Sequence, residues 1–229
     1  MMRNVLLIAM ALVGFGVVHS LVAGHRLKDY LRSRWGDRLV EGWYRLAYNL
    51  VAFVTIAPVL VLMIILPDQT LYRVGAPWKA LLRALQAFGA IGLMASLLFT
   101  DILRFAGLRQ AYAYLTGARL PLPAEPLQER GPYALMRHPL YLFSLLIIWP
   151  QPVMTLNVLV FDIIATLYFA VGSLIEERRL ERIHGDEYRA YRECVPWLLP
   201  WPNFKPGKCS RRDRNAKHVR LLQLSKEEP

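Results

Sequence analysis

Apolar runs alternate with polar, basic connectors along most of this chain. Four runs are about twenty residues long and one is shorter; they cover 5–23, 46–66, 85–103, 139–149 and 156–175. A helix of about twenty apolar residues is long enough to cross the ~30 Å hydrocarbon core of a bilayer. The pattern therefore predicts an all-α integral membrane protein with about five transmembrane helices.

The last two apolar runs are joined by a short segment that begins Pro-Gln-Pro at 150–152. Proline removes a helix hydrogen bond, so the chain is expected to turn here and the two runs form a helical hairpin. The first arm is short, and it crosses the membrane either fully or in part. Both alternatives bring Arg137 and Glu176 to the same membrane face.

Two connectors carry local structure of their own. The connector 24–45 has apolar residues at helical spacing among its cations, and it is interpreted as a helix on the membrane surface or as a solvated loop. In the connector 106–130, residues 108–115 have a helix-forming composition. The stretch that follows contains Pro121, Pro123 and Pro126 and is expected to be extended. Long connectors of this kind are often binding loops.

The charge is strongly positive and unevenly distributed. The 229 residues include 28 lysines and arginines against 17 aspartates and glutamates, a net charge of +11. Most of the cations lie in 24–45, in 106–138 and in the C-terminal tail. Because cytoplasmic loops are rich in Lys and Arg, these parts are predicted to be cytoplasmic and the N-terminus outside. We attribute the charge to topology and to attraction by membrane lipids, with no nucleic-acid partner.

The segment 137–141, Arg-His-Pro-Leu-Tyr, has the composition of an anion site. Proline suits the first turn of a helix, and the free N–H groups of that turn can bind an anion. Arg137 adds a planar cationic group suited to a carboxylate, and His138 and Tyr141 add directed hydrogen bonds. The alternative interpretation is a basic flank that only follows the charge rule of membrane topology.

Two adjacent carboxylates, Glu176 and Glu177, end the last apolar run. Carboxylates at a membrane boundary need cationic partners. These partners are either Arg178, Arg179 or Arg182, or the cationic group of a ligand. A zwitterionic ligand would suit a carboxylate placed beside Arg137. Aromatic rings can also face a cation such as a sulfonium; the candidates are Tyr133, Tyr188 and Tyr191, of which the last two equally fit a packed amphipathic helix.

Other site chemistries are poorly supported by the sequence. The five histidines show no spacing typical of tetrahedral metal ligands, so no metal site is predicted. The chain also contains neither a glycine-rich dinucleotide fingerprint after a strand nor a P-loop.

Two separated segments resemble a known family. GPYALMRHPLYL at 131–142 and EERRLERIHGDEYRAYRECVPWLLP at 176–200 resemble the C-terminal signature of the isoprenylcysteine carboxyl methyltransferase superfamily. HSLVAGHRLKDYL at 19–31 and GLRQAYAYLTG at 107–117 are similar to its nurim-type branch, which includes methanethiol S-methyltransferases and membrane proteins linked to nitric-oxide respiration.

The resemblance implies an S-adenosylmethionine-dependent methyltransferase with a cytosolic cofactor pocket covered by the central connector. It implies catalytic roles for Arg137 and Glu176. The residues that it places around the cofactor are Pro126, Leu127, Gln128, Tyr133, His138, Pro139, Leu140, Tyr141 and Glu176. It also implies a bacterial inner-membrane location and a methyl acceptor that enters from the bilayer. No oligomeric state follows from it.

The organisation expected from the pattern and the resemblance has three parts. A three-helix membrane scaffold covers 1–106, a methyltransferase-like cofactor-binding region with the helical hairpin covers 107–200, and a basic, disordered tail covers 201–229. Gly24-His25-Arg26 does not form a signal-peptide cleavage site, so the first run is expected to remain as a transmembrane helix.

The chain departs from the superfamily pattern at two positions. Phe143 stands where many members have glycine. Gly172 stands where the prenylcysteine enzymes have an arginine that contacts the substrate. Loss of this arginine argues against a carboxylate acceptor and favours a small thiol, another hydrophobic acceptor or a lipid. Two alternatives remain: an NADPH-dependent membrane reductase of related fold, and a non-catalytic membrane accessory protein.

Overall fold

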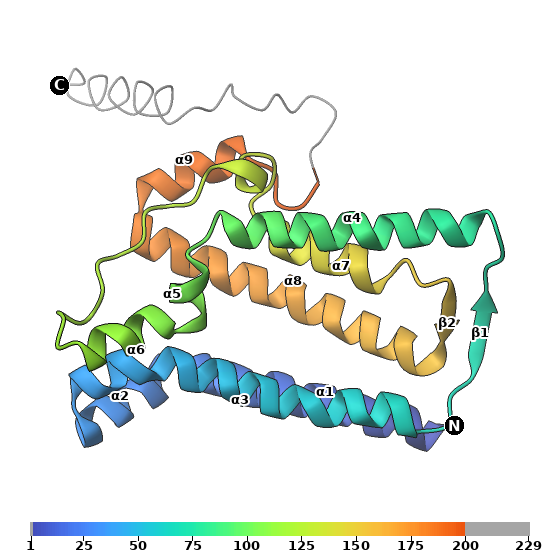
Figure 1. The fold of residues 1–229 in the computed structure, drawn as a ribbon, viewed down its shortest axis with the longest axis horizontal. Helices are drawn as coiled ribbons and strands as arrows, with labels where there is room; N and C mark the ends of the chain where they lie inside the picture. The colour runs from blue at the N-terminus through green and yellow to red at the C-terminus, as the bar shows by residue number, and fades with distance from the viewer. Residues whose placement is uncertain (1, 200–229) are drawn as a thin grey trace, which may run out of the picture.

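The computed structural model describes residues 2–199, and helices dominate it (Figure 1). The elements in chain order are α1 (Met2–Ala23), α2 (His25–Trp35), α3 (Asp37–Ile65), β1 (Thr70–Arg73), α4 (Trp78–Leu98), α5 (Ile102–Ala106), α6 (Leu108–Leu115), the 3₁₀-helix η1 (Gly131–Ala134), α7 (Pro139–Ile148), β2 (Val153–Thr155), α8 (Leu156–His184) and α9 (Asp186–Cys194). The predicted tail at 201–229 lies outside the described residues.

Among the described residues, four helices, α1, α3, α4 and α8, are long and apolar enough to cross a membrane. Their outward faces carry large apolar side chains such as Phe53, Ile64 and Ile91, which are 79%, 82% and 69% exposed. Such a surface suits contact with lipid and is unusual in water. The prediction of an all-α, multi-pass integral membrane protein is confirmed.

Helix α7 is the short arm of the predicted hairpin. Its ten residues rise about 15 Å, roughly half of a bilayer core, so α7 alone does not cross it. It begins part-way along α4 and runs beside it toward β2, after which α8 returns in the opposite direction (Figure 1). The expected return of the chain is therefore present, and its first arm is half-length.

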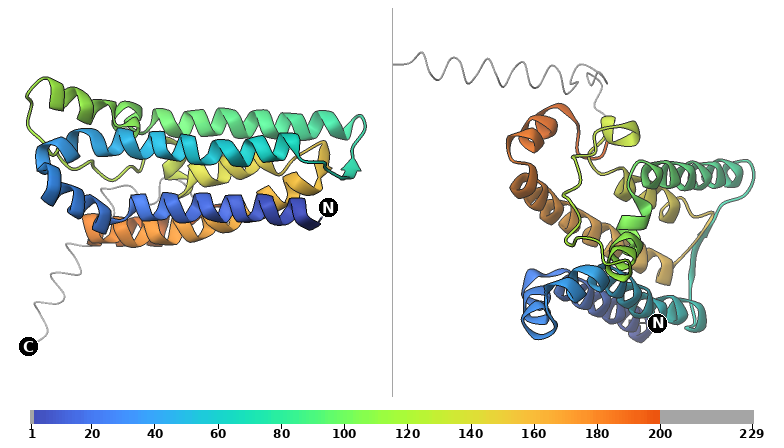
Figure 2. Two further views of the ribbon diagram at one scale, coloured as in Figure 1. Left: turned by 90° about the horizontal axis from the view of Figure 1, so that it is seen from below. Right: turned by 60° about the vertical axis from the view of Figure 1, so that its left-hand side comes forward.

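The long helices form two packed groups (Figures 1 and 2). Helix α1 lies against both α3 and α8, and α4 lies against α7. Ile8 and Leu12 of α1 and Val59 of α3 are buried together, with Phe161 and Ile164 of α8 packed on them. This core fixes α8, the helix that carries the two glutamates, against the N-terminal helices.

Close contact between α4 and α7 explains Phe143. Gly89 and Gly92 of α4 are buried, and the Phe143 ring occupies the space that a side chain at Gly92 would take. The same ring meets Phe88 edge-on at 5.8 Å. The departure from glycine at 143 is thus matched by a glycine on the neighbouring helix.

A two-stranded antiparallel sheet that the sequence pattern did not indicate lies at the end of the bundle where α1 begins (Figure 1). It pairs β1 with β2, with Thr70 opposite Thr155. The strands have four and three residues, too few to show an alternating pattern. Helix α4 also begins earlier than the apolar run, at Trp78, because its first turns carry Lys79 and Arg83.

The shorter helices α2, α5, α6 and α9 gather at the opposite end of the bundle (Figure 1). Helix α2 favours the surface-helix interpretation of 24–45 over a loop, and α6 has the bounds expected for it. The connector after α6 is extended, and Arg104 holds it through the Glu125 carboxylate and the Pro123 carbonyl oxygen, both at 2.6 Å. The division at residue 106 stays a prediction.

Candidate active site

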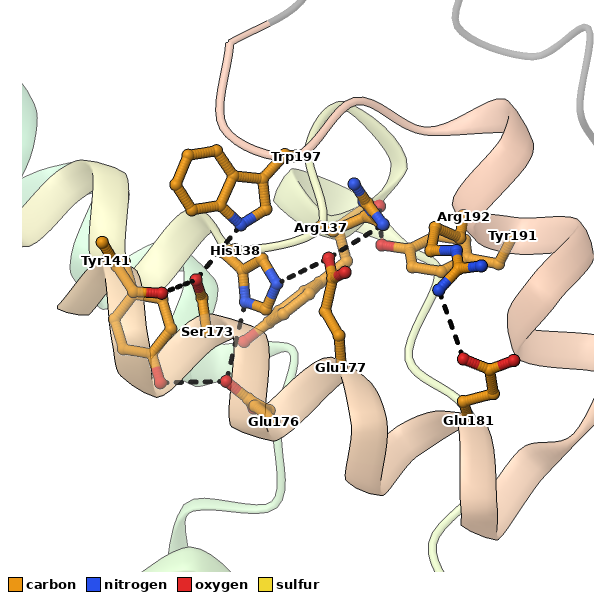
Figure 3. A network of polar contacts seen from close by, with 12 residues as sticks. Arg137, His138, Tyr141, Ser173, Glu176, Glu177, Glu181, Tyr191, Arg192 and Trp197 are labelled. Atoms are coloured by element: carbon orange, nitrogen blue, oxygen red, sulfur yellow. Dashed lines mark hydrogen bonds and ion pairs between the residues drawn. The ribbon is translucent and has the colours of Figure 1, made fainter.

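Two adjacent glutamates on α8 have different surroundings (Figure 3). Successive residues of a helix point about 100° apart, so the two side chains face different neighbours. The Glu177 side chain is 12% exposed, whereas that of Glu176 is 48% exposed. One carboxylate is therefore enclosed by protein and the other is accessible.

Glu177 is neutralised by the segment that precedes α7. Its Oε1 lies 2.8 Å from Arg137 Nη1 and 3.1 Å from His138 Nε2. Arg137 and His138 are themselves 12% and 2% exposed in their side chains. An ion pair this buried holds its partners strongly, because removing one leaves an unpaired charge. Arg137, predicted to meet a ligand anion, has Glu177 as its counter-ion in the structure.

Glu176 is held on one side only. Its Oε2 accepts a hydrogen bond of 2.9 Å from the Tyr141 hydroxyl and lies 3.6 Å from His138 Nδ1. The Tyr141 ring stacks between His138 and Phe169, with centroid distances of 5.4 and 5.3 Å. A Cβ added at Gly172 would have one described atom within 4 Å outside its own helix backbone, the Tyr141 hydroxyl oxygen at 3.7 Å. Glu176 thus presents an oriented negative charge beside aromatic rings and open space.

The backbone before α7 is fixed by the segment that follows α9. The Arg137 N–H donates to the Pro196 carbonyl at 2.9 Å, and the His138 N–H donates to the Trp197 carbonyl at 3.2 Å. Trp197 Nε1 also donates to Ser173 Oγ on α8 at 3.2 Å. Pro139 begins α7 directly afterwards, as expected. Two of the N–H groups near the predicted anion site are therefore already used.

Helix α9 packs on the central connector. Tyr188 and Tyr191 are 0% and 2% exposed and lie with Leu127 and Val195 in one cluster. This burial supports the packing interpretation of the two tyrosines. Burial raises the pKa of both hydroxyls, and burial together with the Glu176 charge raises the pKa of Tyr133. The three phenols therefore stay protonated near neutral pH.

Tyr191→Phe is expected to lower the free energy of unfolding by about 1 kcal/mol, because the Tyr191 hydroxyl donates a 2.7 Å hydrogen bond to the Tyr133 carbonyl. Denaturant titration in detergent measures the change. Tyr112→Phe on α6 is the matched control, since Tyr112 is 70% exposed. Equal stability of the two variants would contradict the expectation.

The residues that the resemblance assigned to a cofactor fall into two groups. The structure brings His138, Pro139, Leu140 and Tyr141 to the start of α7, beside Glu176. Tyr133 lies in η1, close enough to Glu176 for an electrostatic interaction. From the connector, Leu127 packs on α9 and Pro126 is exposed. The Gln128 side chain donates to the Phe99 carbonyl and accepts from the Glu129 and Arg130 N–H groups.

Sequence reasoning missed three contributors to this region. Arg45 of α3 interacts electrostatically with Glu125 and Glu176. Ser173 and Trp197 join α8 to the C-terminal segment. Ser173 lies one helical turn before Glu176, a spacing that identifies it as a neighbour on the same face. Arg45 is far away in sequence and gave no comparable signal.

A cavity of about 180 Å³ lies on the other side of Tyr141, whose hydroxyl donates to Glu176. It lies between α7, α8 and the segment after α9, and its lining residues are Tyr141, Leu145, Thr166, Phe169, Ala170, Ser173, Trp197 and Leu198. Tyr141 therefore belongs both to the cavity wall and to the Glu176 site.

Comparison with known proteins identifies relatives along most of the chain. Methanethiol S-methyltransferase of Mycobacterium tuberculosis is 32% identical over 82% of this chain and 75% of its own length. The chain belongs to the methanethiol S-methyltransferase family. Methanethiol S-methyltransferase 1 of Bradyrhizobium diazoefficiens is also 32% identical, over 86% of this chain and 66% of its own length. Nurim of Xenopus laevis is 32% identical over 42% of this chain and 35% of its own length.

Membership of this family confirms the resemblance to the superfamily and to its nurim-type branch. The chain spans just under two thirds of the Bradyrhizobium relative, 66% of its length. No protein-family model matches the chain, and no solved structure matches it.

Proposed function

We propose that this protein is an integral membrane methyltransferase that transfers a methyl group from S-adenosylmethionine to a small thiol. The observation that carries the proposal is the Glu176 carboxylate, which is oriented by Tyr141 yet 48% exposed. Family membership supports it, because the relatives in five bacterial species are named methanethiol S-methyltransferases.

The residues around Glu176 fit a sulfonium cofactor. A sulfonium cation is stabilised by an accessible carboxylate and by aromatic faces, and both are present at Glu176 and Tyr141. Glu176 would hold the cationic end, with Tyr133, His138, Pro139, Leu140 and Tyr141 around it and Pro126, Leu127 and Gln128 covering it from the connector. When bound, the cofactor supplies an electrophilic methyl group.

The protein's own contribution is orientation and exclusion of water. Methyl transfer is an in-line displacement, so fixing the acceptor against the methyl group supplies much of the rate. Arg137 acts in this proposal as a positioning residue: it holds Glu177, and Glu177 holds His138. The catalytic role predicted for Arg137 thereby becomes an indirect one, while Glu176 keeps direct contact with the ligand.

The proposed orientation places the end with α2, α5, α6 and α9 in the cytoplasm and the N-terminus outside. This end carries the arginine- and lysine-rich connectors, as the charge rule requires. The bacterial relatives support an inner-membrane location.

Glu176→Gln tests the proposal. The substitution removes the charge and keeps the shape, so affinity for S-adenosylhomocysteine and S-adenosylmethionine is expected to fall about tenfold or more, the loss typical of a hydrogen bond to a charged group. The fall should be larger for S-adenosylmethionine, which alone carries the sulfonium. Calorimetry on the purified, detergent-solubilised protein measures both, together with methyl transfer from labelled S-adenosylmethionine to methanethiol.

Glu181→Gln is the matched control, because it removes the same charge from the same helix. Glu181 is not part of the proposed site; it pairs with Arg189 and Arg192. The variant should bind like the wild type. A wild-type protein stabilised by NADPH and not by S-adenosylmethionine would favour the reductase. A protein that binds neither would favour the accessory role.

A further inference from the structure

We propose that Arg45 of α3 binds the carboxylate group at the amino-acid end of the methyl donor. This inference rests on the proposed function and deepens it, because it adds a binding residue from the N-terminal half of the chain and names the group that this residue recognises. S-adenosylmethionine carries a carboxylate a few bonds from its sulfonium. A site for it therefore needs a cation as well as the Glu176 carboxylate.

The cation that the sequence suggested for an anion, Arg137, is already neutralised. Its Nη1 lies 2.8 Å from Glu177 Oε1, and both side chains are 12% exposed. The backbone N–H groups of Arg137 and His138 donate to carbonyl oxygens of the segment after α9. A ligand carboxylate at the start of α7 would have to displace a buried counter-ion, so we expect it to pair with another cation near Glu176.

Arg45 is fixed in position and yet has no counter-ion among the described residues. Its Nε donates to the Phe105 carbonyl at 3.0 Å, and its guanidinium carbon lies 5.1 Å from the centre of the Phe105 ring and 5.9 Å from that of Tyr48. Glu125 interacts with it electrostatically but pairs with Arg104, at 2.6 Å. These contacts hold the guanidinium and leave its two terminal nitrogens, which match the two oxygens of a carboxylate, for a ligand.

Arg45 and Glu176 stand at the same membrane boundary. Arg45 directly precedes the apolar run 46–66, and Glu176 directly follows the run 156–175. The first turns of α3 and the last turns of α8 lie at the end of the bundle that carries α2, α5, α6 and α9 (Figure 1). The two side chains interact electrostatically without forming a direct ion pair. Two separated, opposite charges of this kind suit a ligand that carries both charges.

Aromatic side chains from four helices connect α3 with the Glu176 site. Tyr48 of α3 interacts electrostatically with Tyr141 of α7, whose hydroxyl donates to Glu176. The Tyr48 hydroxyl shares a hydrogen bond with His19 of α1, and the His19 ring lies 6.2 Å from the Tyr168 ring of α8. These contacts bring α1, α3, α7 and α8 together around one region, so a ligand held by Glu176 is close to α3.

Arg179 of α8 is a second cation near Glu176, and it suits the role less well. It interacts electrostatically with both Arg45 and Glu176. Arg179 is exposed, whereas Arg45 is partly buried and is held by a carbonyl and two rings. Binding through Arg45 therefore immobilises less side-chain freedom. A carboxylate on Arg45 would also reduce the repulsion between the two arginines.

Arg45→Gln tests the inference with two ligands that differ only in the carboxylate, S-adenosylhomocysteine and decarboxylated S-adenosylhomocysteine. Calorimetry on the detergent-solubilised wild type should give a Kd about tenfold lower for S-adenosylhomocysteine, the scale of a hydrogen bond between charged groups. In Arg45→Gln this preference should disappear. The affinity for S-adenosylhomocysteine should fall about tenfold, and that for the decarboxylated ligand should stay within about twofold of the wild type.

Arg38→Gln is the matched control, because Arg38 is an arginine on the same helix with similar contacts. It donates to two backbone carbonyls, at 3.0 and 3.3 Å, and lies over the Tyr114 ring at 5.7 Å. These contacts are with α6 and the residues after it, so both affinities should stay within about twofold of the wild type. Arg45→Lys keeps the charge and loses the planar fork, and it should retain a preference of only about threefold.

Equal affinity of the wild type for the two ligands would overturn the inference. An unchanged preference in Arg45→Gln would overturn it too, as would an equal loss of both ligands, because Arg45 would then support the fold and not the carboxylate. Loss of the preference in Arg38→Gln would show an effect of overall charge and would have the same consequence. If Arg45→Gln does not fold, an undiminished preference in Arg45→Lys would contradict the inference. A wild-type protein that binds neither ligand would instead overturn the proposed function, and this inference with it.

Discussion

Glu177→Ala is expected to lower the free energy of unfolding by about 3–5 kcal/mol, the cost typical of breaking a buried ion pair. The Glu177 carboxylate lies 2.8 Å from the Arg137 guanidinium, and both side chains are 12% exposed. Its removal leaves the Arg137 charge buried and takes a partner from His138, which is 2% exposed. Reversible denaturant titration in detergent micelles measures the change.

Two further variants test whether the loss of stability comes from the unpaired buried charge or from any substitution on α8. Glu181→Ala removes a carboxylate whose partners, Arg189 and Arg192, are 57% and 44% exposed, so its effect on stability should be small. Replacing both members of the buried pair, as Arg137→Met with Glu177→Leu, should recover much of the lost stability. A Glu177→Ala cost no greater than that of Glu181→Ala would show that the pair is not buried as described.

Gly92→Leu is expected to separate α4 from α7 and to reduce stability and cofactor affinity together. A side chain at Gly92 would occupy the position of the Phe143 ring, so helix α7 must move. Overpacking of this kind typically costs about 1–3 kcal/mol and sometimes more. Because His138 and Tyr141 stand at the start of α7, affinity for S-adenosylhomocysteine should fall in the same variant.

The double variant Gly92→Leu with Phe143→Gly should restore part of both properties, because the new side chain takes the volume that the ring vacates. Gly14→Leu on α1 is the control, since a Cβ there meets no atom within 4 Å. Thermal unfolding and calorimetry give the two readouts. If Gly92→Leu behaves like Gly14→Leu, the close contact between α4 and α7 is absent in solution.

The fold was predictable where it depends on length and hydrophobicity. A run such as 156–175 must be helical to satisfy its backbone groups in lipid, so α8 could be expected without tertiary information. The start of α4 at Trp78 could not, because its first turns include Lys79 and Arg83 and lower the local hydropathy. The pairing of β1 with β2 depends on where α3 and α8 place their ends, which no local pattern records.

The sequence predicted which residues form the site better than it predicted which of them pair with one another. The sequence identified Arg137, His138, Tyr141 and the two glutamates, because charged residues at a membrane boundary are conspicuous. The residue pattern alone did not distinguish the adjacent Glu176 and Glu177, and only the family resemblance selected Glu176. The distinction comes from the rotation of about 100° between neighbours on α8, which turns Glu177 toward Arg137 and leaves Glu176 accessible.

Two backbone hydrogen bonds join the start of α7 to the segment after α9, from Arg137 to Pro196 and from His138 to Trp197. Because of these bonds, we expect the two segments to open together as one unit in local unfolding. Amide protons at these positions exchange with solvent only when the unit opens, so their exchange rates report the local free energy of opening. Because Trp197 also borders the cavity, a ligand that fills the cavity slows exchange at the amides of Arg137 and His138. Deuterium uptake of one short peptide at the start of α7 would thereby report ligand binding in this cavity without any need for turnover.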